Sequence, residues 1–425
     1  MIFKINPAEF LRGTVNLPSS KSYSIRAFLI ASCGGVSKIQ YPSDCDDSLA
    51  AISAAESLGA SVKKVSENTW EVRRTLAAVK SSSINVKESG TTLRFILPLA
   101  SLFFKKAIIT GEGTLRGRPN KFLLEALRQM GKKIKGAGEA ESIPIMISGG
   151  ELKGGKVSID GTVSSQFISS LLIAAPLLNE DTMLEVTGKK TVSEEYIEMT
   201  IKVLDEAGIS ISRNGKRAFF MKGRQKFKGL RNFKVPADYG LGAFFMAAGA
   251  LNKSKITLRG YFDDSFVQAD GKILDLLQRM GVKFKKTVSA IEIKGPFEIT
   301  GGIFSLKDCP DLLPVLSILA LFAKGKTRFI DIKHARVKES DRISDLRAEL
   351  LKIGADVREK EDELIIFPRE KYKANSILDP HKDHRLAMAF SILGTRIPLA
   401  VKDIECTKKS YPGFVKDLKS LIPKQ

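Results

Sequence analysis

The stretch RVKESDR, Arg336 to Arg342, places five charged side chains within seven residues. The apolar residues that follow, from Ile343 to Ile353, have helical spacing, so the cluster is expected on the first turn of a helix. Free N–H groups and the helix dipole make that end favourable for Asp and Glu and unfavourable for cations. Arg336, Lys338 and Arg342 therefore fit a helix start poorly unless an anion binds there. For the cluster taken alone, a solvated helix end is the alternative.

Four other expected helix starts carry small polar residues or a cation. They are PSSKSYSIRAFLIAS with Lys21 and Arg26, ESGTTLRFILPLAS with Gly90, Thr91 and Arg94, GTVSSQFISSLLIAAPLL with Ser164, Ser165 and Gln166, and DHRLAMAFSILG with Arg385. An ordinary serine N-cap would explain any one of them. Because several starts share this composition, we expect helix N-termini to converge on an anionic ligand.

The elements that carry these residues recur along the chain. An amphipathic helix ending in glycine, then a strand, a turn and a second strand, occurs five times. The helices end at Gly59, Gly131, Gly208, Gly281 and Gly354, at intervals of 72, 77, 73 and 73 residues. Glycine suits the left-handed position after a helix, and the alternating residues that follow suit a hairpin. So regular an interval indicates repeated supersecondary units.

A sixth helix begins in FVKDLKSLIPKQ, and MIFKIN at the other end of the sequence could supply its missing strand. The sequence therefore predicts an α/β protein of six units in two groups of three. We expect one domain over residues 14–232 and a second over residues 1–13 and 233–425, with residues 2–6 pairing in the second.

Length and composition indicate an ordinary globular chain. With 425 residues, 43% of them apolar, it is long enough for two or more domains. The longest apolar runs have about a dozen residues, fewer than the roughly 20 that span a bilayer, and the first residues lack a signal-peptide layout. We therefore expect a cytoplasmic protein with no membrane partner. The four cysteines lack CxxC spacing and indicate neither a zinc site nor a disulfide framework.

The charge balance is strongly basic, with 68 Lys and Arg against 47 Asp and Glu, a net +21. This excess alone would permit nucleic-acid binding. The lysines are spread along the chain without a basic tail or an aromatic-interleaved stripe, so we expect no nucleic-acid partner. The charge would also attract small anionic substrates.

Eight motifs in order resemble the 3-phosphoshikimate 1-carboxyvinyltransferase (EPSP synthase) family over the whole chain. They are LPSSKSYSIRA, SGTTLR, GRPNKFL, SSQFISSLLIAAPLL, CPDLLPVLSILALFAKG, RVKESDRI, DHRLAMAF and KKSYPGF. The resemblance implies a two-domain inside-out α/β barrel, with three βαβαββ repeats in each domain. It implies transfer of the enolpyruvyl group of phosphoenolpyruvate to the 5-hydroxyl of shikimate 3-phosphate, with release of phosphate. It also implies a monomer, and we expect no cofactor and no metal.

The implied chemistry accounts for the residue types. Each substrate carries a carboxylate and a phosphate of about −1.5 to −2 charge near neutral pH, so several Lys and Arg are needed to bind both. Addition of an alcohol to the enol also needs a proton donor and a proton acceptor, which carboxylates among cations can supply.

The resemblance assigns the site residues by position. Phosphoenolpyruvate binding falls to Lys21, Gly90, Thr91, Arg118, Gln166, Arg342, Arg385 and Lys409. Shikimate 3-phosphate binding falls to Lys21, Ser22, Arg26, Ser164, Ser165, Gln166, Ser193, Tyr196, Asp311, His334 and Lys338. Catalysis falls to Asp311, which would deprotonate the 5-hydroxyl, to Glu339, which would exchange the proton at the methylene carbon, and to Lys21.

Local alternatives accompany several of these assignments. Asp311 follows a proline at a helix start, where it would serve as an N-cap, and Ser193 has the same alternative. Asp383 and His384 could be capping and packing groups, with Asp383 supporting the site from behind.

The sequence also departs from the common family pattern. Glu88 and Ser89 stand where Asn and Ala are frequent, His334 replaces a frequent Asn, and Gly240 with Leu241 replaces a usual serine pair. Because Gly90 is kept, we expect sensitivity to the inhibitor glyphosate.

Three other classes of protein share some of these sequence features. UDP-N-acetylglucosamine enolpyruvyl transferase is similar in fold, but GTLRGRPNK lacks its reactive cysteine and Lys21-Ser22 replaces its Lys-Asn pair. An RNA-binding or RNA-processing protein, including the RNA 3'-phosphate cyclase fold, is compatible with the charge and would show salt-dependent retention on nucleic acid. GELKGGKV imitates a phosphate-binding loop, but Val157 lacks the Mg²⁺-binding hydroxyl and a strand rather than a helix is expected next.

Overall fold

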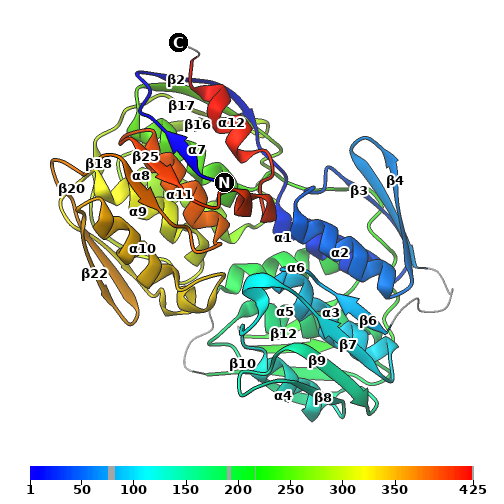
Figure 1. Cartoon of the computed structure of the whole chain (residues 1–425). Helices are drawn as coiled ribbons and strands as arrows, with labels where there is room; N and C mark the ends of the chain where they lie inside the picture. The colour runs from blue at the N-terminus through cyan, green and yellow to red at the C-terminus, as the bar shows by residue number, and fades with distance from the viewer. Residues whose placement is uncertain (75–81, 189–192, 216, 424–425) are drawn as a thin grey trace. The chain divides into compact units, whose positions relative to one another are not determined.

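The computed structural model describes residues 1–74, 82–188, 193–215 and 217–423. The chain folds into two compact units, whose elements are labelled in Figure 1. We call Ser20–Val235 the continuous unit, and Met1–Ser19 with Pro236–Gln425 the discontinuous unit.

In the part of the continuous unit that the structure describes, there are three four-stranded sheets. Their strand orders are β14 (Phe233–Lys234), β3 (Val36–Gln40), β5 (Thr69–Arg74), β4 (Ala60–Ser66); β6 (Ser83–Asn85), β7 (Ala107–Thr110), β9 (Ser142–Gly149), β8 (Lys133–Ala137); and β10 (Gly155–Asp160), β11 (Thr182–Thr187), β13 (Ala218–Met221), β12 (Ile211–Asn214). The strand expected after GELKGGKV is therefore present as β10.

The discontinuous unit contains two four-stranded sheets, one three-stranded sheet and a two-stranded ribbon among its described residues. Their orders are β16 (Phe284–Lys286), β17 (Ala290–Ile293), β15 (Ser254–Arg259), β2 (Leu11–Asn16); β19 (Ile303–Ser305), β21 (Thr327–Ile330), β23 (Glu363–Phe367), β22 (Asp356–Lys360); β1 (Phe3–Ile5), β25 (Leu399–Val401), β24 (Ser376–Leu378); and β18 (Ile299–Thr300) with β20 (Ala323–Lys324).

Every four-stranded sheet repeats one pattern. Two strands pair in parallel, as β10 and β11 do, and the second of them also pairs with an antiparallel hairpin, here β12 and β13. In three of these sheets a crossover that contains a helix joins the parallel strands, namely β6 to β7, β10 to β11 and β19 to β21, whereas the parallel partners β3 and β14, and β2 and β15, lie far apart in the sequence. The five hairpins expected after the periodic glycines are all present, although Lys216 in one of them lies outside the described residues.

The five periodic glycines have φ between 78° and 93°, the left-handed conformation predicted for them. The helices before them form an outer set with one buried face: α2 (Asp46–Ser57), α4 (Lys121–Gln129), α6 (Glu194–Glu206), α8 (Ile273–Arg279) and α10 (Arg342–Lys352). The sixth outer helix is α12 (Phe414–Leu421).

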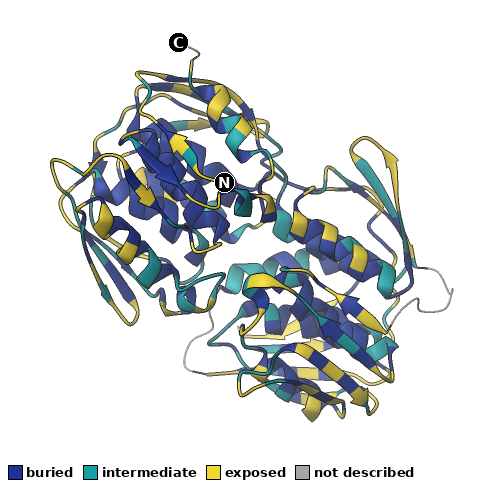
Figure 2. Ribbon diagram, viewed as in Figure 1, coloured by how far each residue is buried: buried dark blue, intermediate teal, exposed yellow. Residues whose placement is uncertain are grey.

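Six inner helices are buried nearly all round. They are α1 (Lys21–Ala31), α3 (Gly90–Phe103) and α5 (Ser165–Ala174) in the continuous unit, and α7 (Tyr239–Leu251), α9 (Leu313–Leu321) and α11 (His384–Gly394) in the discontinuous unit. Figure 2 shows them in the colour of buried residues. A helix that is apolar on all sides belongs in a core, so these inner helices form the core of each unit.

The strand at the start of the chain pairs where the repeat analysis placed it. β1 runs antiparallel to β25, with Ile5 opposite Leu399, and completes the sheet of the sixth repeat. β2 pairs with β15 along its whole length, and β14 pairs with β3 in the continuous unit. The contacts divide the chain at residues 19/20 and 235/236, whereas the repeats gave expected boundaries at 13/14 and 232/233.

Candidate functional site

In the continuous unit, Lys21 is the first residue of α1, after the N-cap Ser20, whose hydroxyl accepts from the backbone N–H of Tyr23 at 3.4 Å. The ammonium of Lys21 lies 2.9 Å from the carboxylate of Asp47, which is buried in the first turn of α2. The predicted catalytic lysine therefore has a fixed, buried counter-charge. Sequence reasoning missed Asp47 because an acidic residue at a helix start is usual in any protein.

Arg26 is buried and links α1 to α6. Its Nε donates to Thr200 Oγ1 at 2.8 Å, and its two Nη groups donate to the backbone oxygens of Ser22 and Tyr196, each at 2.9 Å. Burial lowers the pKa of Arg26 to about 10, which leaves it charged at neutral pH. Arg26 thus holds two other predicted residues, Ser22 and Tyr196, next to each other. Its own contact with shikimate 3-phosphate stays a prediction.

The N-termini of α3 and α5 are adjacent. Gln166 Nε2 donates to Thr91 Oγ1 at 2.9 Å, and Ser164 caps α5 by accepting from the Gln166 backbone N–H at 3.2 Å. Ser165 is buried in the first turn of α5. Ser193 precedes α6 with φ of 56° and makes no side-chain cap, so the capping alternative for its hydroxyl is wrong.

Gly90, at the start of α3, lies against two guanidinium groups. A Cβ atom added there would lie 2.5 Å from Arg94 Nη1 and 2.8 Å from Arg118 Nη1. The absence of a side chain therefore lets Arg118, a predicted phosphoenolpyruvate ligand, approach the backbone of the α3 N-terminus.

Glu88 connects the loop before α3 to the loop that carries Arg118. Its carboxylate accepts from the backbone N–H of Thr114 at 3.3 Å and from the Thr114 hydroxyl at 3.2 Å. Gly113 has φ of 53°, and a Cβ there would lie 2.2 Å from the Glu88 carboxylate. The departure from the common Asn thus has a structural partner in this chain.

In the discontinuous unit, Arg342 binds three carboxylates at once. Its Nε lies 2.6 Å from Asp383, its Nη1 2.6 Å from Asp311 and its Nη2 2.8 Å from Glu339. Arg342 is 1% exposed, so these pairs are almost fully screened from water. The two predicted catalytic carboxylates are therefore held by one guanidinium.

The other predicted cations surround the same carboxylates. Lys338 lies 3.4 Å and Arg385 3.0 Å from Asp311, and Lys409 lies 3.9 Å from Glu339. Burial opposes ionisation of Asp311, but Arg385, Lys338 and Arg342 together hold the pKa of its carboxyl well below the ordinary value. Asp311 is therefore ionised at neutral pH.

Two of the local alternatives are settled by this geometry. Asp311 lies in η4 (Pro310–Leu312), and the N-cap of α9 is Leu312, so the N-cap prediction for Asp311 is wrong. Asp383 both caps α11, accepting from the Arg385 N–H at 2.8 Å, and binds Arg342, as expected of a supporting residue. His384 is 1% exposed and lies inside α11.

The remaining residues of RVKESDR also have defined places. Arg336 pairs with Asp341 at 2.9 Å, and Asp341 caps α10 by accepting from two backbone N–H groups. His334 is buried in η5 (Lys333–Val337), immediately before Lys338.

Asp270 is a second carboxylate that sequence reasoning missed. It is buried in η3 (Ala269–Lys272), and its Oδ2 lies 3.3 Å from Arg385 Nη2. The sequence around it, QADGKIL, is typical of a surface loop. Only the tertiary fold brings this carboxylate to Arg385.

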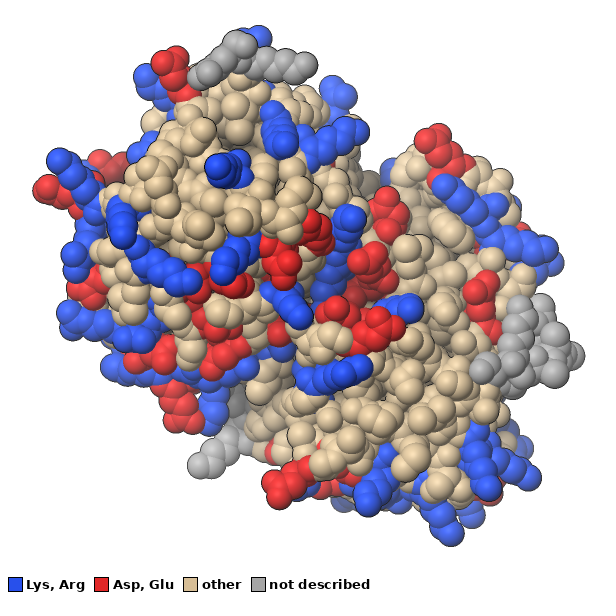
Figure 3. Space-filling model, viewed as in Figure 1, with Lys and Arg blue, Asp and Glu red and all other residues tan. Residues whose placement is uncertain are grey.

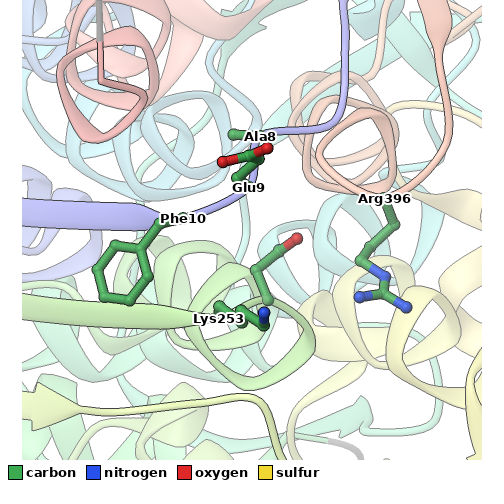
Figure 4. Close-up of a pocket in the computed structure, with 6 residues that line it drawn as sticks. Ala8, Glu9, Phe10, Lys253 and Arg396 are labelled. Carbon is green, nitrogen blue, oxygen red and sulfur yellow. The ribbon is translucent and has the colours of Figure 1, made fainter.

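A pocket of about 540 Å³ also lies in the discontinuous unit, beside the connection from β1 to β2 (Figure 4). Its lining consists of Ala8, Glu9, Phe10, Asn252, Lys253 and Arg396, which are not among the predicted site residues. Arg396 Nη1 donates a hydrogen bond to the backbone oxygen of Leu251 at 3.0 Å.

The surface charge, the cysteines, the lengths of the helices and the clusters of metal-ligating residue types bear on the remaining predictions. On the face drawn in Figure 3, the Lys and Arg side chains of each unit are interspersed with Asp and Glu. All four cysteines are free thiols. Within the described ranges, no helix has both the length and the apolar character to cross a bilayer. In the same part of the chain, no group of three or more His, Cys, Asp or Glu residues is arranged to hold a metal ion.

Comparison with known proteins gives the family. The model of EPSP synthase (3-phosphoshikimate 1-carboxyvinyltransferase) matches residues 5–418. The 3-phosphoshikimate 1-carboxyvinyltransferase of Clostridium kluyveri is 38% identical over 420 residues, covering 98% of this chain and 96% of that protein. That of Methanocaldococcus jannaschii is 36% identical over 422 residues, covering 98% and 97%.

Solved structures agree with this result. The EPSP synthase of Acinetobacter baumannii has a TM-score of 0.80 at 25% identity, covering 99% of this chain and 98% of that one. An enolpyruvyl transferase of Streptomyces tendae has a TM-score of 0.80 at 17% identity, covering 99% and 97%, and so shares the fold. The predicted two-domain α/β fold is confirmed. The chain belongs to the EPSP synthase family, the 3-phosphoshikimate 1-carboxyvinyltransferases.

Proposed function

We propose that the protein transfers the enolpyruvyl group of phosphoenolpyruvate to the 5-hydroxyl of shikimate 3-phosphate, and that the residues above carry out the transfer. The oxygen of the hydroxyl bonds to C2 of phosphoenolpyruvate while C3 gains a proton. The tetrahedral intermediate then loses phosphate by cleavage of its C2–O bond, and C3 gives up a proton. The products are the enol ether and inorganic phosphate.

The observation that carries this proposal is the pair of carboxylates on Arg342. Asp311 and Glu339 lie on different nitrogens of one guanidinium, at 2.6 and 2.8 Å. This arrangement supports the proposal because two carboxylates that could accept and donate a proton lie close together, each with further cations of its own. An anionic ligand that binds Arg385 or Lys338 would withdraw positive charge from Asp311 and raise its pKa, making it a better base.

Each unit supplies its own set of ligand-binding groups in this proposal. In the continuous unit, Ser22, Arg26, Ser164, Ser165, Ser193 and Tyr196 take shikimate 3-phosphate, Gly90, Thr91 and Arg118 take phosphoenolpyruvate, and Lys21 and Gln166 serve both. In the discontinuous unit, Arg342, Arg385 and Lys409 take phosphoenolpyruvate, and His334 and Lys338 take shikimate 3-phosphate. Lys21 shares in the proton transfer. We also propose that the protein is a cytoplasmic monomer. Sedimentation velocity would measure its mass in solution.

The test is release of phosphate from phosphoenolpyruvate and shikimate 3-phosphate. Asp311→Asn and Glu339→Gln are each expected to lower kcat by about 10²- to 10⁴-fold, the usual contribution of a general acid or base. Matched controls are Asp275→Asn and Glu292→Gln, both exposed and in the same unit, which should turn over like the parent. No phosphate from the parent would refute the function, whereas near-parent rates in both site variants would refute only the assigned roles.

A further inference from the structure

Arg385 is shared by the buried carboxylate of Asp270 and the partly exposed carboxylate of Asp311, although the reaction as proposed uses only Asp311. Its Nη2 lies 3.0 Å from Asp311 Oδ2 and 3.3 Å from Asp270 Oδ2. The second oxygen of Asp270, Oδ1, is buried and has no hydrogen-bond partner among the described residues. An ionised carboxylate that is buried with a single long contact to a cation lowers the stability of the fold. Its presence here therefore favours a functional role for Asp270 over a stabilising one.

Gly240 makes the space that Asp270 occupies. A Cβ at Gly240, in the first turn of α7, would lie 2.2 Å from Asp270 Oδ2 and 3.1 Å from Arg385 Nη1. Gly240 is outside the set of glycines with positive φ, so the backbone there does not require glycine. The replacement of the usual serine is therefore explained by room for the Asp270–Arg385 contact.

Charged groups face Asp270 from each element that packs against it. Asp238 lies at the start of α7, where it caps Leu241 at 3.0 Å, and Asp311 lies in η4. Arg385 of α11 and Lys338, before α10, supply the positive charge. Burial raises the pKa of Asp270 to about 7, Arg385 acts against this rise, and Asp311 and Asp238 add to it. Asp270 is thus poised to change its charge near neutral pH.

We propose that Asp270 is a positioning residue for Arg385 that takes up a proton when phosphoenolpyruvate binds, so that affinity for phosphoenolpyruvate falls as Asp270 ionises. This proposal depends on the role of Arg385 given under the proposed function. An ionised Asp270 competes with the ligand for Arg385 and repels it, whereas a neutral Asp270 does neither. Bound ligand in turn raises the pKa of Asp270 further. Linkage of one proton then weakens binding by at most about tenfold for each pH unit between the pKa of Asp270 in the free protein and its higher pKa in the complex.

Asp270→Asn tests the proposal because Asn resembles the protonated acid at every pH. We would measure KM for phosphoenolpyruvate by phosphate release from pH 6 to 9, at saturating shikimate 3-phosphate, in parent and variant. Ionisation of the substrate cancels in the ratio of parent KM to variant KM. That ratio is expected to rise by about tenfold or more between pH 6 and 9, with a smaller change in kcat. A ratio that does not vary with pH would overturn the proposal.

Three further variants sharpen the result. Asp264→Asn, on the same connection and with an 85% exposed side chain, should keep the ratio near one at every pH. Asp270→Ala removes the partner of Arg385 and should raise KM across the whole range. If Asp270→Asn does not fold, Gly240→Ala displaces the carboxylate from Arg385 and should likewise reduce the rise of KM with pH. Lack of turnover by the parent would refute the proposed function, while turnover with a flat ratio refutes the Asp270 proposal alone.

Discussion

At the scale of residues, Arg342 determines where the proposed acid and base can lie. Its planar guanidinium offers donors in fixed directions, and three of its nitrogens each bind a carboxylate. Burial opposes its charge, but Asp383, Asp311 and Glu339 raise its pKa well above the ordinary value. A lysine would supply the charge without the geometry, so the spacing of Asp311 and Glu339 depends on arginine specifically.

Gly90→Ala is expected to raise KM for phosphoenolpyruvate by about tenfold or more, with a smaller effect on kcat. The added methyl group would press on Arg94 and Arg118, and a disturbed charge-assisted hydrogen bond costs about 1.5–3 kcal/mol. The phosphate-release assay at varied phosphoenolpyruvate gives both constants. Gly302→Ala is the control because a Cβ there meets ring atoms at an ordinary 3.5 Å. An unchanged KM for Gly90→Ala would contradict the proposed position of Arg118.

Glyphosate can be tested in the same assay. We expect it to inhibit the parent protein at limiting phosphoenolpyruvate, because Gly90 leaves the α3 N-terminus without a side chain. Parent rates that are insensitive to high glyphosate would count against this expectation.

The sequence predicted the types of the site residues better than their partners. Charge of the wrong sign at a helix start predicts an anion site at Lys338 and Arg342 independently of the family resemblance. Asp47 and Asp270 gave no such signal, because each acts on a cation from another segment: Lys21 is 26 residues from Asp47, and Arg385 is 115 residues from Asp270. Contacts of that kind follow from the tertiary fold, which a local pattern does not specify.

At the scale of elements, inner helices present several of the predicted site residues at their N-termini. α1, α3 and α5 begin with Lys21, Gly90 and Ser165, and α11 begins next to Asp383. The hairpins could be predicted because glycine and alternating residues specify them locally. The loops that hold Arg118 and Asp311 were not predicted, because their shape depends on side chains of other loops.

Glu88→Ala is expected to raise KM for phosphoenolpyruvate about three- to tenfold. The change removes both hydrogen bonds to Thr114, and with them the connection between the α3 N-terminus and the loop of Arg118; one such bond contributes about 1 kcal/mol net. The kinetic constants of the phosphate-release reaction provide the measurement. Glu139→Ala is the control. Glu139 is exposed in the turn between β8 and β9, so the KM of this variant should equal that of the parent. Equal KM values in all three proteins would show that Glu88 does not position Arg118.

At the scale of the whole molecule, each unit completes one sheet with a strand that lies next to a chain crossing. β2 precedes the continuous unit in sequence yet pairs with β15, while β14 follows that unit's other strands and pairs with β3. The discontinuous unit is completed by β1, where Ile5 lies so close to α11 that a Cβ on Gly394 would be 2.7 Å from Ile5 Cβ. The repeat count predicted the pairing of β1, because a helix without its strand needed one.

Ile5→Ala is expected to destabilise the protein by about 2–5 kcal/mol, since it leaves a cavity at a buried contact with α11. Ile2→Ala, at a position that is 53% exposed, should change stability by no more than about 0.5 kcal/mol. Urea unfolding followed by circular dichroism measures both. Trp70, the only tryptophan in the sequence, lies in β5, so its fluorescence reports on unfolding of the continuous unit. The urea midpoint measured by that fluorescence should shift less in Ile5→Ala than the midpoint measured by circular dichroism. Similar shifts for the two variants would show that β1 contributes little to the fold.

The pairing of β1 with β25 has a consequence for synthesis of the chain. Ile5 and Leu399 are 394 residues apart (399 − 5), so β1 leaves the ribosome long before its partner β25. Domains generally fold as units while the chain emerges, and the continuous unit can do so once β14 is out. Leu11 and Val15, both buried in the finished protein, lack their partners until β15 has emerged, and the buried Ile5 lacks its partner until β25 has emerged. The unit that carries Arg342 is therefore completed only after β25 has left the ribosome, and the apolar residues of β1 and β2 are a natural early substrate for chaperones.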